Sequence, residues 1–239
     1  MICVNRDAGS CGTVRNFLQI AVSNGIQQFL LTMRYHLLIW TSLFYLLPQA
    51  AMAVEEPEFK LLEKSAAFEL RQYPALIVAE VLVAGDLDQA SGNGFRLLAD
   101  FIFGNNRAPA GAAEKIAMTA PVTVEPLDSK IAMTAPVTVQ PESGQWQVRF
   151  VMPGRYTLAT LPVPNNPQVR IREVPGRKVA VITFPGLAGE SKTAQKTAEL
   201  LSWIAGKQLK PAGTPELARY NPPWTLPFLR RNEVMVAYE

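Results

Sequence analysis

The 239-residue chain contains only two cysteines and one histidine. Cys3, Cys11 and His36 all precede residue 54, so the part of the chain after that point has neither a thiol nor an imidazole. This excludes disulfides, Ser-His-Asp triads, cysteine nucleophiles and zinc sites built from His or Cys in that part. We also find no GxSxG, GxxxxGK[ST], HExxH or GxGxxG motif and no tight carboxylate cluster. The sequence therefore indicates a protein that is not an enzyme and has no metal site made by its side chains.

Excess charge of one sign is also missing. The whole chain has 23 Lys and Arg against 20 Asp and Glu. Three of these cations and one of these anions precede residue 54, which leaves 20 against 19 and a net charge near +1 in the remaining 186 residues. Such a balance provides no electrostatic footprint for nucleic acid. A length of 186 residues suffices for one domain with a full core.

Long apolar runs are absent, with one short exception near the start. Arg34 is followed by an apolar run over 37–47, then Pro48, then Ala51-Met52-Ala53. A positive start, a short apolar run and an A-x-A site are typical of a secretory signal peptide, and the run is shorter than the roughly 18 residues that span a bilayer.

We therefore expect a dispensable extension over 1–32, a signal peptide over 33–53 and one domain over 54–239. Cleavage near Ala53 would deliver this domain to the periplasm or the extracellular space. Contact with a membrane is expected only through an uncleaved leader.

The clearest positive signal is an internal repeat: KIAMTAPVTV at 115–124 recurs letter for letter at 130–139. In each copy every second residue is apolar, which is the period of a strand with one buried face. The link at 125–129 contains turn-forming residues. The repeat therefore predicts a hairpin with Val124 opposite Ile131 and Val122 opposite Met133, because a slip by one residue would turn the apolar side chains to the wrong face.

The segments before the repeat predict three strands and a helix. The strands are expected at 59–63, 68–71 and 76–83. Asp86 and Asp88 can cap the helix, whose apolar residues follow at helical spacing. Gly92 and Gly94 weaken its first turns, so the regular part is expected only from about Phe95. The helix should end at 104–106.

The segments after the repeat follow the same plan. Strands are expected at 146–152, 169–174, 179–184, 217–220 and 234–238, with a connector at 161–167 and a helix at 190–209. The buried stripe of that helix is expected to comprise Ala194, Ala198, Leu201 and Ala205, flanked by Thr197 and Ile204. Two similar groups of strands with one helix each predict an α+β fold: duplicated half-units forming a distorted antiparallel barrel or sheet with two main helices.

Candidate binding residues are apolar side chains with a few cations near them. They come from the first helix, the repeat and the segment 220–231: Phe95, Arg96, Leu98, Ala99, Ile102, Phe103, Met118, Met133, Tyr220, Trp224, Arg230 and Arg231. Each also has a purely structural interpretation. Apolar residues at helical spacing usually form core, methionines on strands fill gaps, and Trp224 between prolines is suited to cover a sheet edge.

Three stretches carry a family resemblance: KIAMTAPV after a helix ending in FIFGNN, VRFVMPGRYTLATLPVPNNPQVRI, and YNPPWTLPFLRRNEVMV. In this order they resemble the SOUL family of haem-binding proteins over about 58–239, as an exported bacterial-type member. The resemblance implies a duplicated α+β fold that binds haem or a related tetrapyrrole noncovalently in an apolar cleft beside the first helix. It also implies that the family core needs only one copy of the repeat.

Two departures from the family pattern affect the expected cofactor. The basic residues credited with meeting the haem propionates are replaced here, so that role would fall to Arg96, Lys115, Lys130, Arg230 or Arg231. Histidine is missing, so the iron would be ligated by Tyr220, by Met118 or Met133, by a lysine, or by no side chain.

Three functions remain open. The first is an exported tetrapyrrole carrier, scavenger or buffer. The second is a binding module of the same fold for another apolar ligand or a protein partner. The third is a small-molecule hydrolase, by analogy of fold with multidrug-binding regulators alone.

Overall fold

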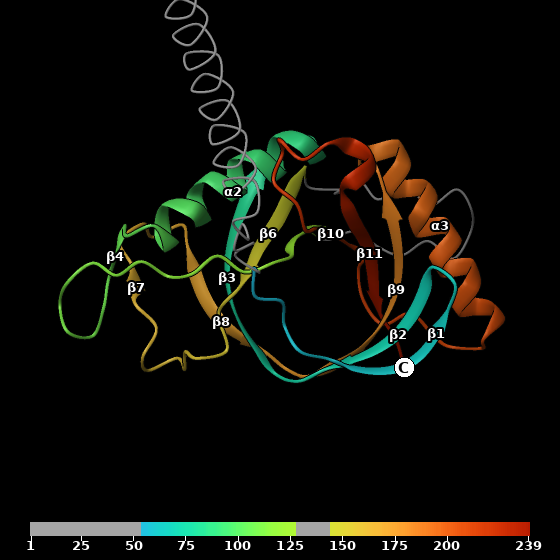
Figure 1. Cartoon of the computed structure of the whole chain (residues 1–239), viewed down its shortest axis with the longest axis horizontal. Helices are drawn as coiled ribbons and strands as arrows, with labels where there is room; N and C mark the ends of the chain where they lie inside the picture. Colours follow the sequence, from blue (N-terminus) through green and yellow to red (C-terminus); the bar gives the residue numbers. More distant parts are fainter. Residues whose placement is uncertain (1–53, 128–143) are drawn as a thin grey trace, which may run out of the picture. The chain divides into compact units, whose positions relative to one another are not determined.

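The computed structural model describes residues 54–127 and 144–239, and it shows one large antiparallel sheet with two helices (Figure 1). Nine strands are hydrogen-bonded in the order β1-β2-β9-β11-β10-β5-β6-β3-β8, and the sheet does not close into a barrel. The expected α+β class with a distorted sheet is confirmed. The strands of this sheet are β1 (Lys60–Ser65), β2 (Phe68–Tyr73), β3 (Leu76–Ala84), β5 (Val122–Pro126), β6 (Gln145–Val151), β8 (Arg170–Val174), β9 (Arg177–Pro185), β10 (Glu216–Arg219) and β11 (Arg231–Ala237).

The strand order is that of two interleaved half-units. One half contains β2, β3, α2 (Leu87–Ile102), β5 and β6; the other contains β8, β9, α3 (Glu190–Gly206), β10 and β11. The corresponding strands of the two halves are β2 and β8, β3 and β9, β5 and β10, and β6 and β11. When each strand in the order β2-β9-β11-β10-β5-β6-β3-β8 is replaced by its counterpart, the same order results, read backwards. A pseudo-twofold axis therefore passes between β10 and β5. A small separate ladder joins β4 (Asn106–Arg107), which follows α2, to β7 (Val163–Pro164), which lies in the expected connector.

Helix α2 begins earlier than its glycines suggested. The side chain of Asp86 caps it by accepting hydrogen bonds from the backbone N–H groups of Asp88 and Gln89, which confirms the expected cap. Regular helix then starts at Leu87 rather than near Phe95. Gly94 is buried against β6, where an added Cβ would lie 2.5 Å from a methyl carbon of Val148. The glycine is therefore explained by close packing of helix on strand rather than by an irregular start.

Helix α3 buries a different face from the expected one. Its buried residues are Thr193, Thr197, Leu200 and Ile204, and Leu201 packs only partly against the core. The prediction that Ala194, Ala198, Leu201 and Ala205 form the buried stripe was wrong, although the expected flanking residues Thr197 and Ile204 are buried. Two large aliphatic side chains, Leu200 and Ile204, bury more apolar area than alanines and so set the rotation of the helix.

One face of the sheet carries both helices and the main core. Helix α2 lies along β3 and β6, and α3 lies along β9 and β11 (Figure 1). Alternate strand residues such as Val81, Val148, Ile182 and Val234 point into this layer, each at most 1% exposed. Within the described residues, no helix is both long and apolar enough to cross a bilayer.

The predicted hairpin between the two repeat copies was wrong. Strand β5, formed by the end of the first copy, is an interior strand: Val124 lies opposite Val148 of β6 on one side and opposite Leu217 of β10 on the other. Both edges of β5 are therefore occupied, and Ile131 has no edge at which to pair with Val124. The second copy itself lies outside the described residues.

Candidate ligand-binding surface

The predicted residues of α2 divide between core and surface. Leu98 and Ile102 are buried in the main core, Ala99 is also buried, and the ring of Phe95 packs against Phe150 with its centroid 5.5 Å away. These residues hold the helix on the sheet, so they do not line a cleft that a ligand can reach. Burial on the helix-covered face follows from the same spacing that had suggested a ligand site.

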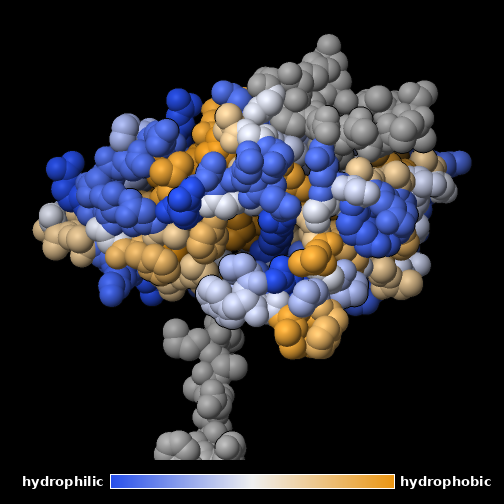
Figure 2. Space-filling model, turned by 90° about the horizontal axis from the view of Figure 1, so that it is seen from above, coloured by the Kyte–Doolittle hydropathy of each residue, from blue (hydrophilic) through white to orange (hydrophobic). Residues whose placement is uncertain are grey.

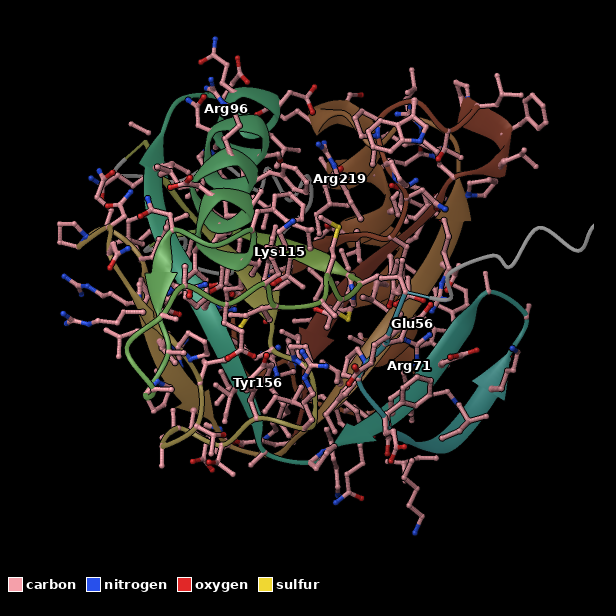
Figure 3. All side chains as sticks on the ribbon, turned by 60° about the vertical axis from the view of Figure 1, so that its left-hand side comes forward. Glu56, Arg71, Arg96, Lys115, Tyr156 and Arg219 are labelled. Atoms are coloured by element: carbon pink, nitrogen blue, oxygen red, sulfur yellow. The ribbon has the colours of Figure 1, made fainter. Side chains whose placement is uncertain are left out.

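Two predicted residues of this helix region do reach the surface. Arg96 points away from the sheet and donates to the side-chain oxygen of Asn93, and Phe103 is exposed just beyond the last turn (Figure 3). Lys115 is exposed on the segment that follows, where Ile116 N–H donates to the carbonyl of Ile102. Met118 is partly buried against the core, and Met133 lies outside the described residues.

Among the described residues, four of the exposed large apolar side chains lie together on the segment 220–230, here called the C-terminal loop. Trp224 is 82% exposed and Phe228 is 70% exposed, and Leu226 and Leu229 are more than half exposed. The loop contains three prolines and the short 3₁₀ helix η1 (Pro227–Leu229). Arg230 donates from Nε to the carbonyl of Thr225 at 2.7 Å and from its other end to the carbonyl of Pro223. These bonds fold the loop over Arg230 and engage two of its three nitrogens with the backbone, which leaves less of its guanidinium for a propionate.

Tyr220 at the start of this loop belongs to a buried polar network. Its hydroxyl donates to Glu233 Oε2 at 2.7 Å, and the guanidinium of Arg231 lies 3.8 Å from the centre of its ring. Burial, and then the charge of Glu233, raise the pKa of the Tyr220 phenol well above its ordinary value. Tyr220 therefore stays a neutral phenol and is a poor candidate for a tyrosinate ligand of iron.

Glu233 and Arg71 form the centre of this network, and neither was predicted from the sequence. Arg71 donates from its two terminal nitrogens to the two oxygens of Glu233 at 2.8 and 3.0 Å, and both side chains are at most 2% exposed. Burial opposes ionisation of Glu233, but the hydrogen bonds and charge of Arg71 prevail and lower its pKa. Arg231 joins the network, bonding Glu233 and both oxygens of Glu56.

A second buried network lies further along the same helix-free face. Arg149 of β6 pairs with Glu125 of β5, and Arg177 pairs with Glu216 of β10 at 2.6 Å. Burial, and then the charge of Glu216, raise the pKa of Glu125 to about 7. Both networks consist of charged residues at alternate positions of otherwise apolar strands, and this pattern is visible in the sequence. Alternate residues of a strand point to the same face, which here is the face opposite to the helices.

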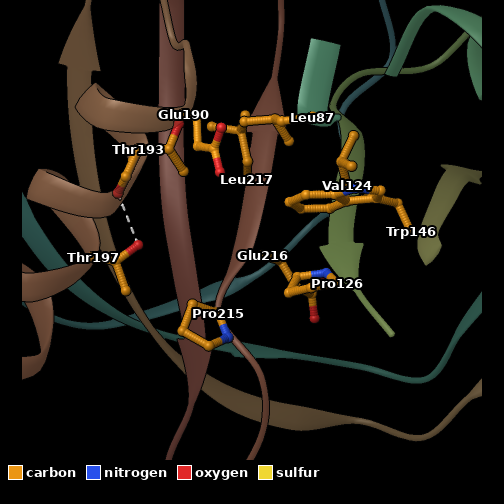
Figure 4. Close-up of a pocket in the computed structure, with 10 residues that line it drawn as sticks. All are labelled: Leu87, Val124, Pro126, Trp146, Glu190, Thr193, Thr197, Pro215, Glu216 and Leu217. Atoms are coloured by element: carbon orange, nitrogen blue, oxygen red, sulfur yellow. Dashed lines mark hydrogen bonds between the residues drawn. The ribbon is translucent and has the colours of Figure 1, made fainter. Parts of the chain in front are cut away.

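Two hollows are lined by described residues, and both are small for a tetrapyrrole. The first, of about 300 Å³ including space open to solvent, lies below the two helices between Leu87, Trp146, Thr193 and Leu217 (Figure 4). The second, of about 400 Å³, opens on the helix-free face beside Tyr73, Arg177 and Met235. Neither includes any of the twelve predicted site residues.

These observations decide how haem fits the described residues. No group of three or more His, Cys, Asp or Glu able to hold a metal ion occurs among them. Tyr220 is committed to Glu233, Arg230 to the loop backbone, and Arg231 to two carboxylates. Among the predicted residues that the structure describes, Arg96, Phe103 and Trp224 remain accessible, as does Lys115, and Trp224 lies within the apolar surface of the C-terminal loop. This set fits the face of a flat apolar ring with anionic substituents, held without a side-chain ligand from the described residues.

Comparison with solved structures supports the fold. The C-terminal domain of EcmrR superposes with a TM-score of 0.52 at 11% identity, covering 72% of this chain and 96% of that one. An uncharacterized conserved protein from Listeria innocua gives 0.50 at 13% identity, covering 72% and 92%. A hydrolase from Listeria innocua gives only 0.48 at 10% identity, covering 74% and 94%, which is too low to support the fold. At such identities the likeness concerns the fold alone.

Comparison of the sequence with families and with curated proteins gave different outcomes. No curated protein matches the chain. The sequence model described as SOUL heme-binding protein matches residues 54–237, which covers all of the described strands and helices. The chain belongs to the SOUL heme-binding protein family.

Proposed function

We propose that this protein binds haem or a related tetrapyrrole noncovalently on the C-terminal loop, and that it acts as an exported carrier, scavenger or buffer of that ligand. Membership of a haem-binding family supports the ligand class. The single observation that carries the location is the loop itself, where Trp224, Leu226, Phe228 and Leu229 are all more than half exposed. Clusters of exposed apolar side chains mark binding surfaces, because they stabilise the free protein little.

The loop is suited to a flat ligand because its shape is set before binding. Its prolines restrict the backbone, and Arg230 ties two of its carbonyls together, so little conformational entropy is lost when a ligand settles on it. An indole and a phenyl ring offer planar area to a macrocycle. We assign the pairing with carboxylates of a ligand that extends towards α2 to Arg96 on that helix and Lys115 on the segment after it, because both are exposed cations. When bound, haem would supply the redox and ligand-binding chemistry of its iron, and the protein would supply only apolar contact and charge.

The surface also suits a weak and exchangeable interaction. Apolar patches lie open on the otherwise hydrophilic surface of the molecule (Figure 2). Binding without an axial side-chain ligand depends on burying the ring faces, so affinity should be modest and tolerant of different tetrapyrroles. This behaviour is what a carrier or buffer requires.

A titration with haemin tests the proposal. The parent chain should give a saturable shift of the Soret band at one equivalent, and Trp224→Ala should raise the dissociation constant about tenfold through loss of stacking area. Leu226→Ala should weaken binding less, while Leu158→Ala is the matched control, because Leu158 is similarly exposed on a different loop. Unchanged free-haemin spectra with micromolar parent chain would reject the ligand. Equal affinities for Trp224→Ala and Leu158→Ala would reject the location.

The same measurement separates the alternatives. If haemin does not bind, the loop remains a docking surface for another apolar ligand or a protein partner, which is the second function. The hydrolase is less supported: Glu125, with its raised pKa, lines neither hollow, and Tyr73, which lines the second, has its hydroxyl bonded to Arg71 and a pKa raised first by burial. A phenol of raised pKa is a poor base or nucleophile at neutral pH.

A further inference from the structure

The hollow of about 400 Å³ on the helix-free face lies beside two strand connections. Residues 74–75 join β2 to β3 and residues 175–176 join β8 to β9, and each connection leads from one side of the sheet to the other (Figure 1). They pack closely, since a Cβ added to Gly176 would lie 3.0 Å from the carbonyl oxygen of Tyr73. Pro74 and Pro175 of these connections line the hollow, so this part of its wall is rigid before any ligand arrives.

Most of the wall is apolar. Four of the lining residues are prolines, which have no backbone N–H to donate, and four more are Leu76, Val151, Val174 and Met235. Arg177 is the charged residue among those that line the hollow. An apolar hollow with a few polar groups is the usual form of a small-molecule site, and this volume is within the range of such sites.

The guanidinium of Arg177 has one engaged side and one open side. Its Nη1 lies 2.6 Å from Oε1 of Glu216, which fixes the orientation of the group. Within the part of the chain that the structure describes, Nε and Nη2 make no hydrogen bond, and the side chain is 35% exposed. These two nitrogens form the edge that pairs with both oxygens of a carboxylate.

Arg231 shows how an arginine on the same face of the sheet uses both sides. Its Nη1 donates to the two oxygens of Glu56, each at 3.0 Å. Its Nε and Nη2 donate to Glu233 at 3.1 and 2.8 Å. Arg177 has a carboxylate at Nη1, as Arg231 does, but none of the described carboxylates is bonded to its other edge.

The ion pairs around Arg177 favour a further negative charge. They balance three arginines against three carboxylates, namely Arg149, Arg172 and Arg177 against Glu80, Glu125 and Glu216. Burial, and then the charge of Glu216, raise the pKa of Glu125 to about 7, so this carboxyl is neutral in about half of the molecules at pH 7. The set then carries a net positive charge.

We propose that this hollow is a binding site for a small apolar monocarboxylic acid, such as an aromatic or branched-chain acid. The carboxylate pairs with Nε and Nη2 of Arg177, and the apolar part lies against the aliphatic side chains and prolines of the wall. The site is separate from the C-terminal loop and does not depend on binding of a tetrapyrrole there.

A titration of the full chain with benzoate, followed by the ¹³C-methyl signals of its methionines, tests the site. The signal of Met235, assigned by its loss in Met235→Leu, should shift saturably with a dissociation constant of about 1 mM or lower. The signal of Met152, which is buried in the main core, should stay in place. Benzyl alcohol has the same ring without the charge and should bind about tenfold more weakly.

Two substitutions separate the role of the charge from that of the hollow. Arg177→Lys keeps a cation beside the buried Glu216 but removes the two-nitrogen edge, so it should raise the dissociation constant for benzoate about tenfold. Arg172→Lys is the matched control, because Arg172 is partly exposed, pairs with Glu80 and does not line the hollow. Val174→Phe fills the hollow and should abolish the Met235 shift with both probes.

Four results would overturn the proposal. A Met235 signal that stays in place at saturating benzoate would remove the site, and equal affinities for benzoate and benzyl alcohol would remove the recognition of the carboxylate. Equal affinities of Arg177→Lys and Arg172→Lys for benzoate would remove the role of Arg177. A Met235 signal that moves with haemin but not with benzoate would mean that a propionate of a tetrapyrrole, not a small acid, enters the hollow. Trp224→Ala should leave the benzoate titration unchanged, which keeps this test apart from that of the C-terminal loop.

Discussion

Two charged residues on the helix-free face are buried and depend on each other, although they lie 162 positions apart in the chain. Arg71 and Glu233 are both almost fully buried, and each would cost several kcal/mol to bury without the other. Their bidentate bond, with Tyr220 as a further donor to Glu233, satisfies both charges and fixes how β2 and β11 lie relative to each other across β9. Each member of the pair therefore makes the burial of the other possible.

Removing one member of this pair should be severe. We expect Arg71→Leu to lower the free energy of unfolding by about 3 kcal/mol, because it leaves the buried Glu233 carboxylate with the partly exposed Arg231 as its remaining charged partner. Arg71→Leu with Glu233→Leu should recover most of the loss. Urea unfolding of the three chains measures this. Arg172→Leu is the matched control, since Arg172 is 41% exposed, pairs with Glu80 and should cost under about 1 kcal/mol. A double variant as unstable as Arg71→Leu would contradict the account.

At the scale of elements, sequence periodicity predicted which segments fold but not always which face they bury. Strand positions and the Asp86 cap followed from alternation and local chemistry. The rotation of α3 did not, because Leu200 and Ile204 compete with an equally regular alanine stripe. The pairing of the repeat did not, because its real partners, β6 and β10, lie in other segments and are not visible in a local pattern.

For a similar reason, the sequence did not predict which of the candidate site residues are exposed and which are buried. Trp224, Arg96 and Phe103 are exposed as a ligand surface requires, whereas Leu98 and Ile102 have the same apolar character and are core. Nothing in composition separates the two groups. Tyr220 and Arg231 were predicted as ligand contacts, and their role in binding Glu233 depends on Arg71, which lies far away in sequence.

The two glycines of α2 give a matched pair of predictions. An added Cβ at Gly92 meets nothing within 4 Å, so Gly92→Ala should raise the free energy of unfolding by about 0.5–1 kcal/mol through helix propensity. At Gly94 the same atom would lie 2.5 and 2.6 Å from carbons of Val148. Gly94→Ala should therefore lower it by about 1–3 kcal/mol despite the better propensity. Thermal unfolding of both variants decides the matter, and stabilisation by Gly94→Ala would show that α2 is not seated tightly on β6.

For the whole molecule, the family match and the described elements both begin at or just after residue 54. The preceding apolar run and A-x-A site support the proposal that the domain from residue 54 onwards is exported and that residues 33–53 are removed. N-terminal sequencing of the exported protein should find Val54 as the first residue. A mature chain that begins with Met1, or one that retains His36, would contradict this and would restore an imidazole to the inventory.

The interleaving of the two half-units affects how the chain reaches its native state. Strand β2 pairs with β9, and β3 pairs with β8, so each half completes its hydrogen bonding only on the other. Strand β5 has partners on both sides only after β10, which begins at Glu216, has been made. Partners so distant in sequence join late, and until then the nascent polypeptide exposes unpaired strand edges. We expect such a polypeptide to stay loosely structured during synthesis, which is the condition that the proposed export through a narrow secretion channel requires.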